Sequence, residues 1–121
     1  MPKQVSILGD GGWGTGLALV SNRVGHRTTL WSAFPDYAQE LAVKRENRKY
    51  LPGIPLPPNL KITSNIQEAV ESAEFIVFAV PSQYLRNVLF QVRNFNLSRK
   101  ILVSVTKGIE KKTLLRPSQI A

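Results

Sequence analysis

Residues 5–15 read Val-Ser-Ile-Leu-Gly-Asp-Gly-Gly-Trp-Gly-Thr and carry the strongest structural signal in this chain. A short apolar run leads directly into Gly-x-Gly-x-x-Gly, and a helical pattern follows. We expect Gly9 to form the tight turn, Gly11 to leave room for a pyrophosphate, and Gly14 to let the helix pack closely on the strand. Because the N-terminus of a helix attracts anions, the motif predicts a dinucleotide-binding turn.

Two other interpretations of these glycines are a tight turn without a ligand and the phosphate-binding P-loop of a nucleoside-triphosphate enzyme. The triphosphate loop needs lysine where Thr15 stands, so this sequence disfavours it. Asp10 lies inside the motif, and a carboxylate would repel a pyrophosphate. We therefore expect the Asp10 side chain to point away from the phosphates.

Composition limits the class of protein. The 121 residues suit one domain, here 1–121, and 43% of them are hydrophobic. The chain has no cysteine and one histidine, which excludes disulfides, thiolate metal sites and multi-histidine metal sites. Because no apolar run approaches the roughly 18 residues of a membrane span, we expect a soluble cytoplasmic protein.

The net charge of +8 favours anionic ligands, which include cofactor phosphates, an acidic substrate and nucleic acid. One local cluster contains Lys44, Arg45, Arg48 and Lys49. No nucleic-acid-binding motif accompanies the charge, so we do not expect nucleic acid as a partner.

Strand and helix patterns alternate along the chain. We expect strands over 3–8, 28–31, 60–63, 75–80 and 100–105, and helices over 13–24, 36–45, 65–72 and 82–90, with a further helix from Thr113. Residues 47–60 contain four prolines and should form a loop, not a helix or a central strand. The runs 75–80 and 100–105 are apolar enough for strands buried on both faces. The order predicts an α/β fold with a doubly wound, mostly parallel sheet in three α/β/α layers.

The end of the second strand should contact the adenosine ribose. NAD sites commonly carry an acid there, but here the sequence is Trp-Ser-Ala-Phe-Pro, with no acid before Asp36. No arginine replaces it. Ser32 could bond either ribose form, and Lys44 or Arg45 could approach a 2′-phosphate. The sequence leaves NAD and NADP open, with a slight preference for NADP.

Later strand ends supply further candidates. Tyr84 could stack beside the cofactor or simply pack on its helix, and Lys107, between a strand and Gly108, could reach an anion in the cleft or remain a solvated turn residue. His26 precedes the second strand and so lies at the edge of the sheet opposite these strand ends. This position favours a structural or solvated histidine over a catalytic one. No nucleophile–base pair or carboxylate dyad is evident, so a bound cofactor would supply the chemistry.

Several segments together resemble the NAD(P)-dependent glycerol-3-phosphate dehydrogenases. They are Gly9–Ala18, Gly25-His26 before Leu30-Trp31, Asn47 before Tyr50-Leu51-Pro52-Gly53, Val80-Pro81-Ser82 and Lys107-Gly108-Ile109-Glu110. The resemblance covers nearly the whole chain. It implies a Rossmann-type coenzyme domain of an oxidoreductase that reduces dihydroxyacetone phosphate to sn-glycerol 3-phosphate for phospholipid synthesis.

The same resemblance assigns residues to the site. Gly12, Trp13, Ser32, Ala33, Tyr50 and Tyr84 would contact the cofactor with the motif glycines, and Lys107 would touch both cofactor and substrate. No catalytic residue is expected in these 121 residues, because family members run to two or three times this length and carry the catalytic lysine in a helical C-terminal domain.

The chain therefore resembles a fragment that ends before the last strand or strands of its sheet, and we expect it to bind a dinucleotide weakly without turnover. A homodimer is the candidate assembly. The alternative is a non-catalytic, dinucleotide-binding regulatory module. Strongly salt-dependent DNA affinity without nucleotide affinity would instead indicate a nucleic-acid binder.

Overall fold

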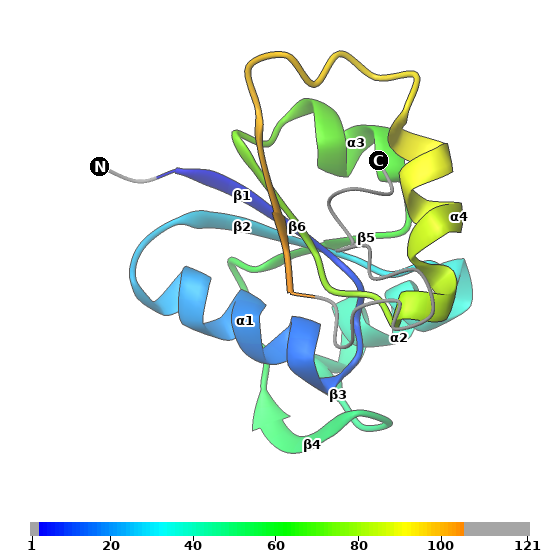
Figure 1. The fold of residues 1–121 in the computed structure, drawn as a ribbon. Helices are drawn as coiled ribbons and strands as arrows, with labels where there is room; N and C mark the ends of the chain where they lie inside the picture. The colour runs from blue at the N-terminus through cyan, green and yellow to red at the C-terminus, as the bar shows by residue number, and fades with distance from the viewer. Residues whose placement is uncertain (1–2, 106–121) are drawn as a thin grey trace.

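A computed structural model describes residues 3–105, apart from the side chain of Ser82. The prediction of a mostly parallel sheet is confirmed, and the five strands of the main sheet lie in the order β5-β2-β1-β6-β7 (Figure 1). The strands are β1 (Gln4–Leu8), β2 (Arg27–Trp31), β5 (Lys61–Thr63), β6 (Phe75–Phe78) and β7 (Ile101–Ser104). The helices are α1 (Gly12–Arg23), α2 (Pro35–Lys44), α3 (Ile66–Glu71) and α4 (Ser82–Val92).

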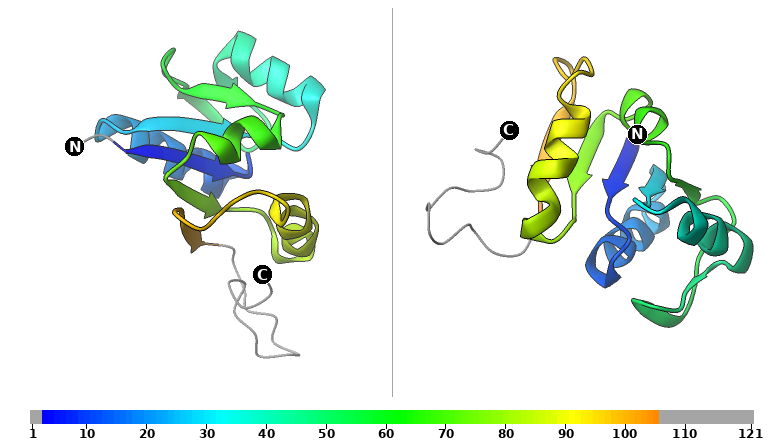
Figure 2. Two further views of the ribbon diagram at one scale, coloured as in Figure 1. Left: turned by 90° about the horizontal axis from the view of Figure 1, so that it is seen from above. Right: turned by 90° about the vertical axis from the view of Figure 1, so that its right-hand side faces the viewer.

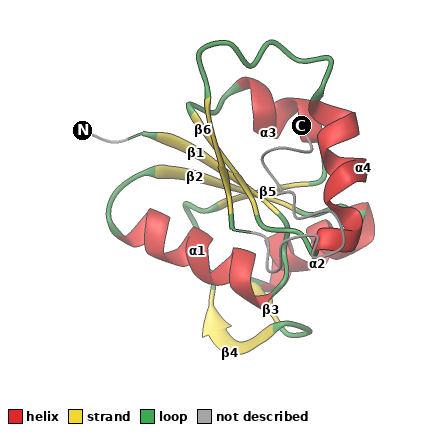
Figure 3. Cartoon of the chain, viewed as in Figure 1, coloured by secondary structure: helices red, strands yellow, loops and turns green. Residues whose placement is uncertain are grey.

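Helices cover both faces of the sheet (Figures 2 and 3). Alternate residues of β1 enter the two cores, because neighbouring side chains of a strand point to opposite faces. Ile7 packs with Ala18 of α1 and Leu41 of α2, whereas Leu8 packs in the cluster that contains residues of α3 and α4. The three-layer prediction is therefore confirmed.

The helix α1 buries a different stripe from the one that its valines indicate. Val20 and Val24 are exposed, and the buried positions are Gly14, Thr15 and Ala18. Small residues form this contact because α1 lies close to the sheet: a Cβ on Gly14 would lie 3.2 Å from the side chain of Ala79.

The proline-rich segment is a short antiparallel hairpin of β3 (Glu46–Asn47) and β4 (Leu51–Pro55). The prediction of a loop is therefore wrong for the residues of these two strands, whereas the exclusion of a helix and of a central strand is confirmed. Two-residue β3 and the prolines of β4 make a separate edge ribbon, where prolines are tolerated. The hairpin lies beside the beginning of α1 (Figure 1).

The last described strand, β7, was predicted to be buried on both faces, and this prediction is wrong. Ile101, Leu102 and Val103 are 54%, 40% and 37% exposed. Within residues 3–105, β7 pairs with β6 on one side and is the outer strand of the sheet. The predicted turn at Lys107-Gly108 and the helix from Thr113 lie outside the described residues.

Candidate functional site

The glycine turn lies where the strand order of the sheet reverses. The chain runs from β1 outward to β2 and β5, then returns to the other side of β1 with β6. Ligands of doubly wound sheets bind at this point, outside the carboxyl ends of the strands. Gly9 has φ of +132°, and a Cβ there would lie 2.7 Å from the carbonyl oxygen of Ala79, which follows β6. Only glycine fits this turn.

The three motif glycines have different surroundings. A Cβ on Gly14 would overlap the carbonyl oxygen of Gly9, so this glycine serves the close packing of α1 on the turn. A Cβ on Gly11 would meet nothing within 4 Å. Gly11 therefore borders open space, as expected for the position that a pyrophosphate approaches.

The N-terminus of α1 is prepared for an anion. Its N-cap is Gly11, which provides no side-chain hydrogen bond, and its first turn contains no acidic residue. The first N–H groups of a helix have no partner within the helix. A pyrophosphate that accepted from them would satisfy these donors and gain from the helix dipole. The residues of the turn thus fit a dinucleotide. Trp13, beside it, is 56% exposed.

The hairpin covers Gly12. A Cβ on Gly12 would lie 2.8 Å from the carbonyl oxygen of Tyr50. The Tyr50 ring is exposed and meets the Tyr37 ring edge to face, with ring centroids 6.4 Å apart. Lys49 lies over both rings, 5.4 Å from the centroid of Tyr50 and 6.0 Å from that of Tyr37. Tyr50 therefore reaches the turn through its backbone, and its exposed ring packs against the half-buried ring of Tyr37.

Asn47 joins the hairpin to the glycine turn and was not assigned a role from the sequence. Its side chain is fully buried. Its Nδ2 donates to the Asp10 carbonyl at 2.6 Å and to Thr15 Oγ1 at 2.8 Å. Its Oδ1 accepts from the Tyr37 hydroxyl and from Tyr50 N. The signal that could have found it is an asparagine just before Tyr-Leu-Pro-Gly in a segment otherwise read as loop.

Tyr37 completes this network from α2. Its hydroxyl donates to Asn47 and accepts from the backbone N–H of Lys49 at 3.3 Å. Burial raises the pKa of Tyr37, and the charge of Asp10 acts in the same direction, while the Lys49 backbone bond opposes them. The hydroxyl therefore keeps its proton for Asn47 at neutral pH.

Asp10 and Ser32 meet at the end of β2. Ser32 is fully buried, and its Oγ donates to Asp10 Oδ2 at 2.7 Å. We expected the Asp10 carboxylate to point away from the phosphates, and the structure places it against the residue that follows β2. Sequence reasoning looked for an acid only after β2 and so missed one that comes from the glycine turn.

The remaining candidate residues take no part in the hydrogen bonds described above among Asp10, Ser32, Tyr37 and Asn47. Ala33 is exposed just beyond Ser32, and Tyr84 is 56% exposed in the first turn of α4, which follows β6. Lys107 lies outside the described residues. His26 lies at the other end of the sheet, where its Nδ1 accepts from Lys3 N at 3.0 Å, in agreement with a structural role.

Two members of the basic cluster have partners of their own. Arg45 Nη1 donates to the carbonyl oxygens of Pro57 and Leu60, at 3.1 and 2.7 Å. Lys49 lies over the two tyrosine rings. The suggested role of Arg45 at a 2′-phosphate therefore has no support in this arrangement, because its guanidinium is bonded to a loop.

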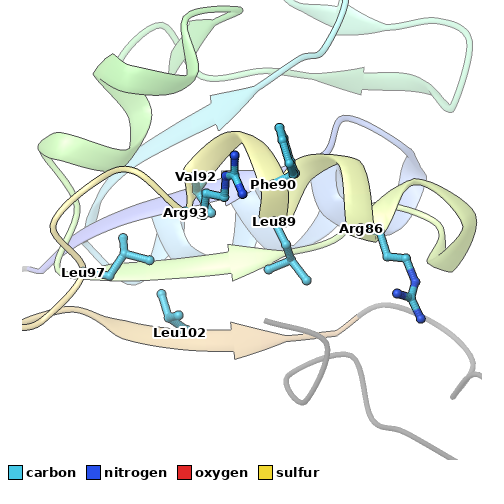
Figure 4. A pocket seen from close by; sticks show the side chains of 7 residues that line it. All are labelled: Arg86, Leu89, Phe90, Val92, Arg93, Leu97 and Leu102. Atoms are coloured by element: carbon cyan, nitrogen blue, oxygen red, sulfur yellow. The ribbon is translucent and has the colours of Figure 1, made fainter.

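A groove of the described residues lies away from the glycine turn. It has a volume of about 520 Å³ between α4 and β7, and Figure 4 shows its lining: Arg86, Leu89, Phe90, Val92, Arg93, Leu97 and Leu102. Neither the glycine turn nor Ser32 contributes to it. Within residues 3–105, no group of three or more potential acidic, histidine or cysteine ligands could hold a metal ion, and no helix is long and apolar enough to cross a membrane.

Sequence comparisons identify relatives of the whole described fold. The family model for the NAD-dependent glycerol-3-phosphate dehydrogenase N-terminus matches residues 4–121. The chain is 42% identical over 116 residues to a glycerol-3-phosphate dehydrogenase [NAD(P)+] of Chlorobium limicola. The matched region covers 96% of this chain and 35% of the relative. The chain is 45% identical over 116 residues to the protein of the same name in Corynebacterium glutamicum, with the same coverage. The chain thus spans about a third of the length of these curated relatives.

Solved structures agree with the sequence comparisons. The glycerol-3-phosphate dehydrogenase of Coxiella burnetii superposes with a TM-score of 0.89 at 32% identity, over 99% of this chain and 37% of that chain. The yeast enzyme gives a TM-score of 0.79 at 29% identity, over 91% of this chain and 35% of that chain. With the family match, the glycine turn at the β1–β6 reversal leads to one conclusion: this chain belongs to the NAD(P)-dependent glycerol-3-phosphate dehydrogenase family, as its N-terminal NAD-binding domain.

Proposed function

We propose that this chain is the coenzyme-binding part of an enzyme that reduces dihydroxyacetone phosphate to sn-glycerol 3-phosphate with NAD(P)H, and that the product enters phospholipid synthesis. The observation that carries the proposal is the open space at Gly11, beside an uncapped helix N-terminus. The names of the relatives, glycerol-3-phosphate dehydrogenase [NAD(P)+], supply the reaction.

The residues of this chain bind and orient the cofactor. Backbone N–H groups at the start of α1 hold the pyrophosphate, and the end of β2 at Ser32 and Ala33 receives the adenosine ribose. Trp13, Tyr50 and Tyr84 lie beside the bound cofactor, and Lys107 contacts both cofactor and substrate. When bound, the reduced nicotinamide supplies the hydride.

The 121-residue chain alone should not turn over, because the chain spans a third of its relatives and the resemblance places the proton-transferring lysine outside it. Oxidation of NADH by the purified chain with dihydroxyacetone phosphate, followed at the nicotinamide absorbance, measures this. We expect no rate above the background without protein. Substrate-dependent oxidation would contradict the proposal for the isolated chain and would leave cofactor binding intact.

Replacing Gly11 with valine tests the placement of the phosphates. The new side chain would enter the space that the pyrophosphate needs, so NADH binding should fall at least tenfold, about 1.4 kcal/mol. The fold should persist because a Cβ at this position meets nothing within 4 Å. Titration with NADH, followed by the fluorescence of exposed Trp13, measures the affinity.

Gly16→Val is the matched control. Gly16 lies farther along α1, and a Cβ there also meets nothing within 4 Å. This variant should bind NADH like the original chain. Undiminished affinity in Gly11→Val, or an equal loss in both variants, would contradict the site at the turn.

A further inference from the structure

The carboxylate of Asp10 lies where a dinucleotide site senses the adenosine ribose. Ser32 directly follows β2, the place at which NAD sites commonly carry an acid for the ribose 2′-hydroxyl, about 20 residues beyond the glycines. Here a serine holds that place, and its hydroxyl binds an acid from the glycine turn at 2.7 Å. The turn and the strand end are also joined by a backbone bond of 3.1 Å from Gly9 N to the Trp31 carbonyl.

Ser32 is unsuited to bind a 2′-phosphate in this arrangement. A hydroxyl has one proton to donate, and the acceptors around Ser32 Oγ are Asp10 Oδ2 at 2.7 Å and, at 3.4 Å, the carbonyl oxygen of Phe34. Phosphate oxygens need donors. Asp10 in turn has several acceptor positions, and Ser32 is its one hydrogen-bond partner at the carboxylate among residues 3–105. The pair therefore offers acceptors and negative charge to the ribose.

Two basic side chains of this region are held by partners of their own. The Arg45 guanidinium is bonded to the carbonyl oxygens of Pro57 and Leu60. The Lys49 ammonium lies over the rings of Tyr37 and Tyr50. The charged group that is hydrogen-bonded at the end of β2 is the Asp10 carboxylate, through Ser32.

We propose that Asp10, held in place by Ser32, makes this chain select NAD(H) over NADP(H). The carboxylate accepts a hydrogen bond from the 2′-hydroxyl of NAD and repels the 2′-phosphate of NADP. This inference rests on the proposed function, which places a dinucleotide at the glycine turn. It reverses the slight preference for NADP that the missing acid after β2 indicated.

Dissociation constants for NADH and NADPH, measured by Trp13 fluorescence at low salt, test the proposal. The original chain should bind NADH at least about tenfold more tightly, because two like charges a few ångströms apart near a protein surface repel strongly. Asp10→Asn removes the charge and keeps the shape of the side chain. It should tighten NADPH binding and reduce the ratio to about threefold or less. Salt should weaken the discrimination of the original chain.

Asp36→Asn is the matched control. It removes the same charge from an exposed residue in the first turn of α2, close in sequence to Ser32. The ratio of the two affinities should not change. Ser32→Ala, which frees the Asp10 carboxylate, should reduce the ratio less than Asp10→Asn and should weaken NADH binding.

The outcomes separate this inference from the proposed function. NADPH binding as tight as NADH binding in the original chain would overturn the inference and leave the cofactor site standing. An equal loss of both affinities in Asp10→Asn would overturn it too, because Asp10 would then only support the turn. A changed ratio in Asp36→Asn would transfer the role to that acid. Failure to bind either nucleotide would refute the proposed function itself. If Asp10→Asn does not fold, the ratio in the original chain and in Ser32→Ala decides.

Discussion

Asn47 is the residue on which the glycine turn and the hairpin both depend. Its buried amide donates to Asp10 and Thr15 and accepts from Tyr37 and Tyr50. A buried amide with all of these partners fixes the relative position of the two segments, because no neighbouring group can replace it. The hairpin consequently holds the Tyr50 carbonyl over Gly12.

Asn47→Ala should destabilise the chain by about 2–4 kcal/mol, because it leaves buried donors and acceptors without partners. Urea denaturation measures the loss. NADH affinity should fall as well, since the turn loses its support. Asn59→Ala is the control: exposed Asn59 accepts one bond of 3.2 Å from Asn22, and its loss should cost less than about 0.5 kcal/mol. Equal costs in the two variants would contradict the role of Asn47.

At the scale of single residues, sequence reasoning found the turn but not what holds it. Gly9, Gly11 and Gly14 have the surroundings that the motif predicts, since its spacing reflects local backbone geometry. Asn47 and the Asp10–Ser32 contact depend on segments far apart in the chain, and no local pattern encodes such a meeting. All of the predicted cofactor contacts stay predictions, from the motif glycines, Gly12 and Trp13 to Ser32, Ala33, Tyr50, Tyr84 and Lys107.

At the scale of elements, β1 and β7 have similar composition and different surroundings. Ile7 of β1 is 2% exposed between two helical layers, whereas Ile101 of β7 is 54% exposed. Apolar runs of this kind indicate a strand but not its position in the sheet. The hairpin shows the same limit, because the proline rule excludes a central strand and does not exclude an edge ribbon.

Truncation of these two isoleucines should separate the two strands energetically. Ile7→Ala should cost about 2–5 kcal/mol, the usual range for emptying a packed core site. Ile101→Ala should cost less than about 1 kcal/mol, because half of the side chain already contacts water in the described fold. Urea denaturation of both variants provides the comparison. A loss in Ile101→Ala as large as that in Ile7→Ala would mean that β7 is covered in solution.

At the scale of the whole molecule, the alternation of strands and helices predicted the three-layer parallel architecture. Parallel neighbours need a crossover, and helices of this length supply it. The order β5-β2-β1-β6-β7 lies beyond any local pattern, because it depends on the side of β1 to which the chain returns after β5. That return creates the reversal at which the glycine turn lies.

The unequal surroundings of Gly9, Gly11 and Gly14 have a consequence for mutational libraries of this domain. Side chains at positions 9 and 14 would collide with backbone atoms, so variants there would disappear from any screen for expressed, folded protein. Variants at position 11 would survive that screen and disappear only when nucleotide capture is demanded. Position 11 is therefore the place in the turn at which selection for the ligand can be told apart from selection for the fold.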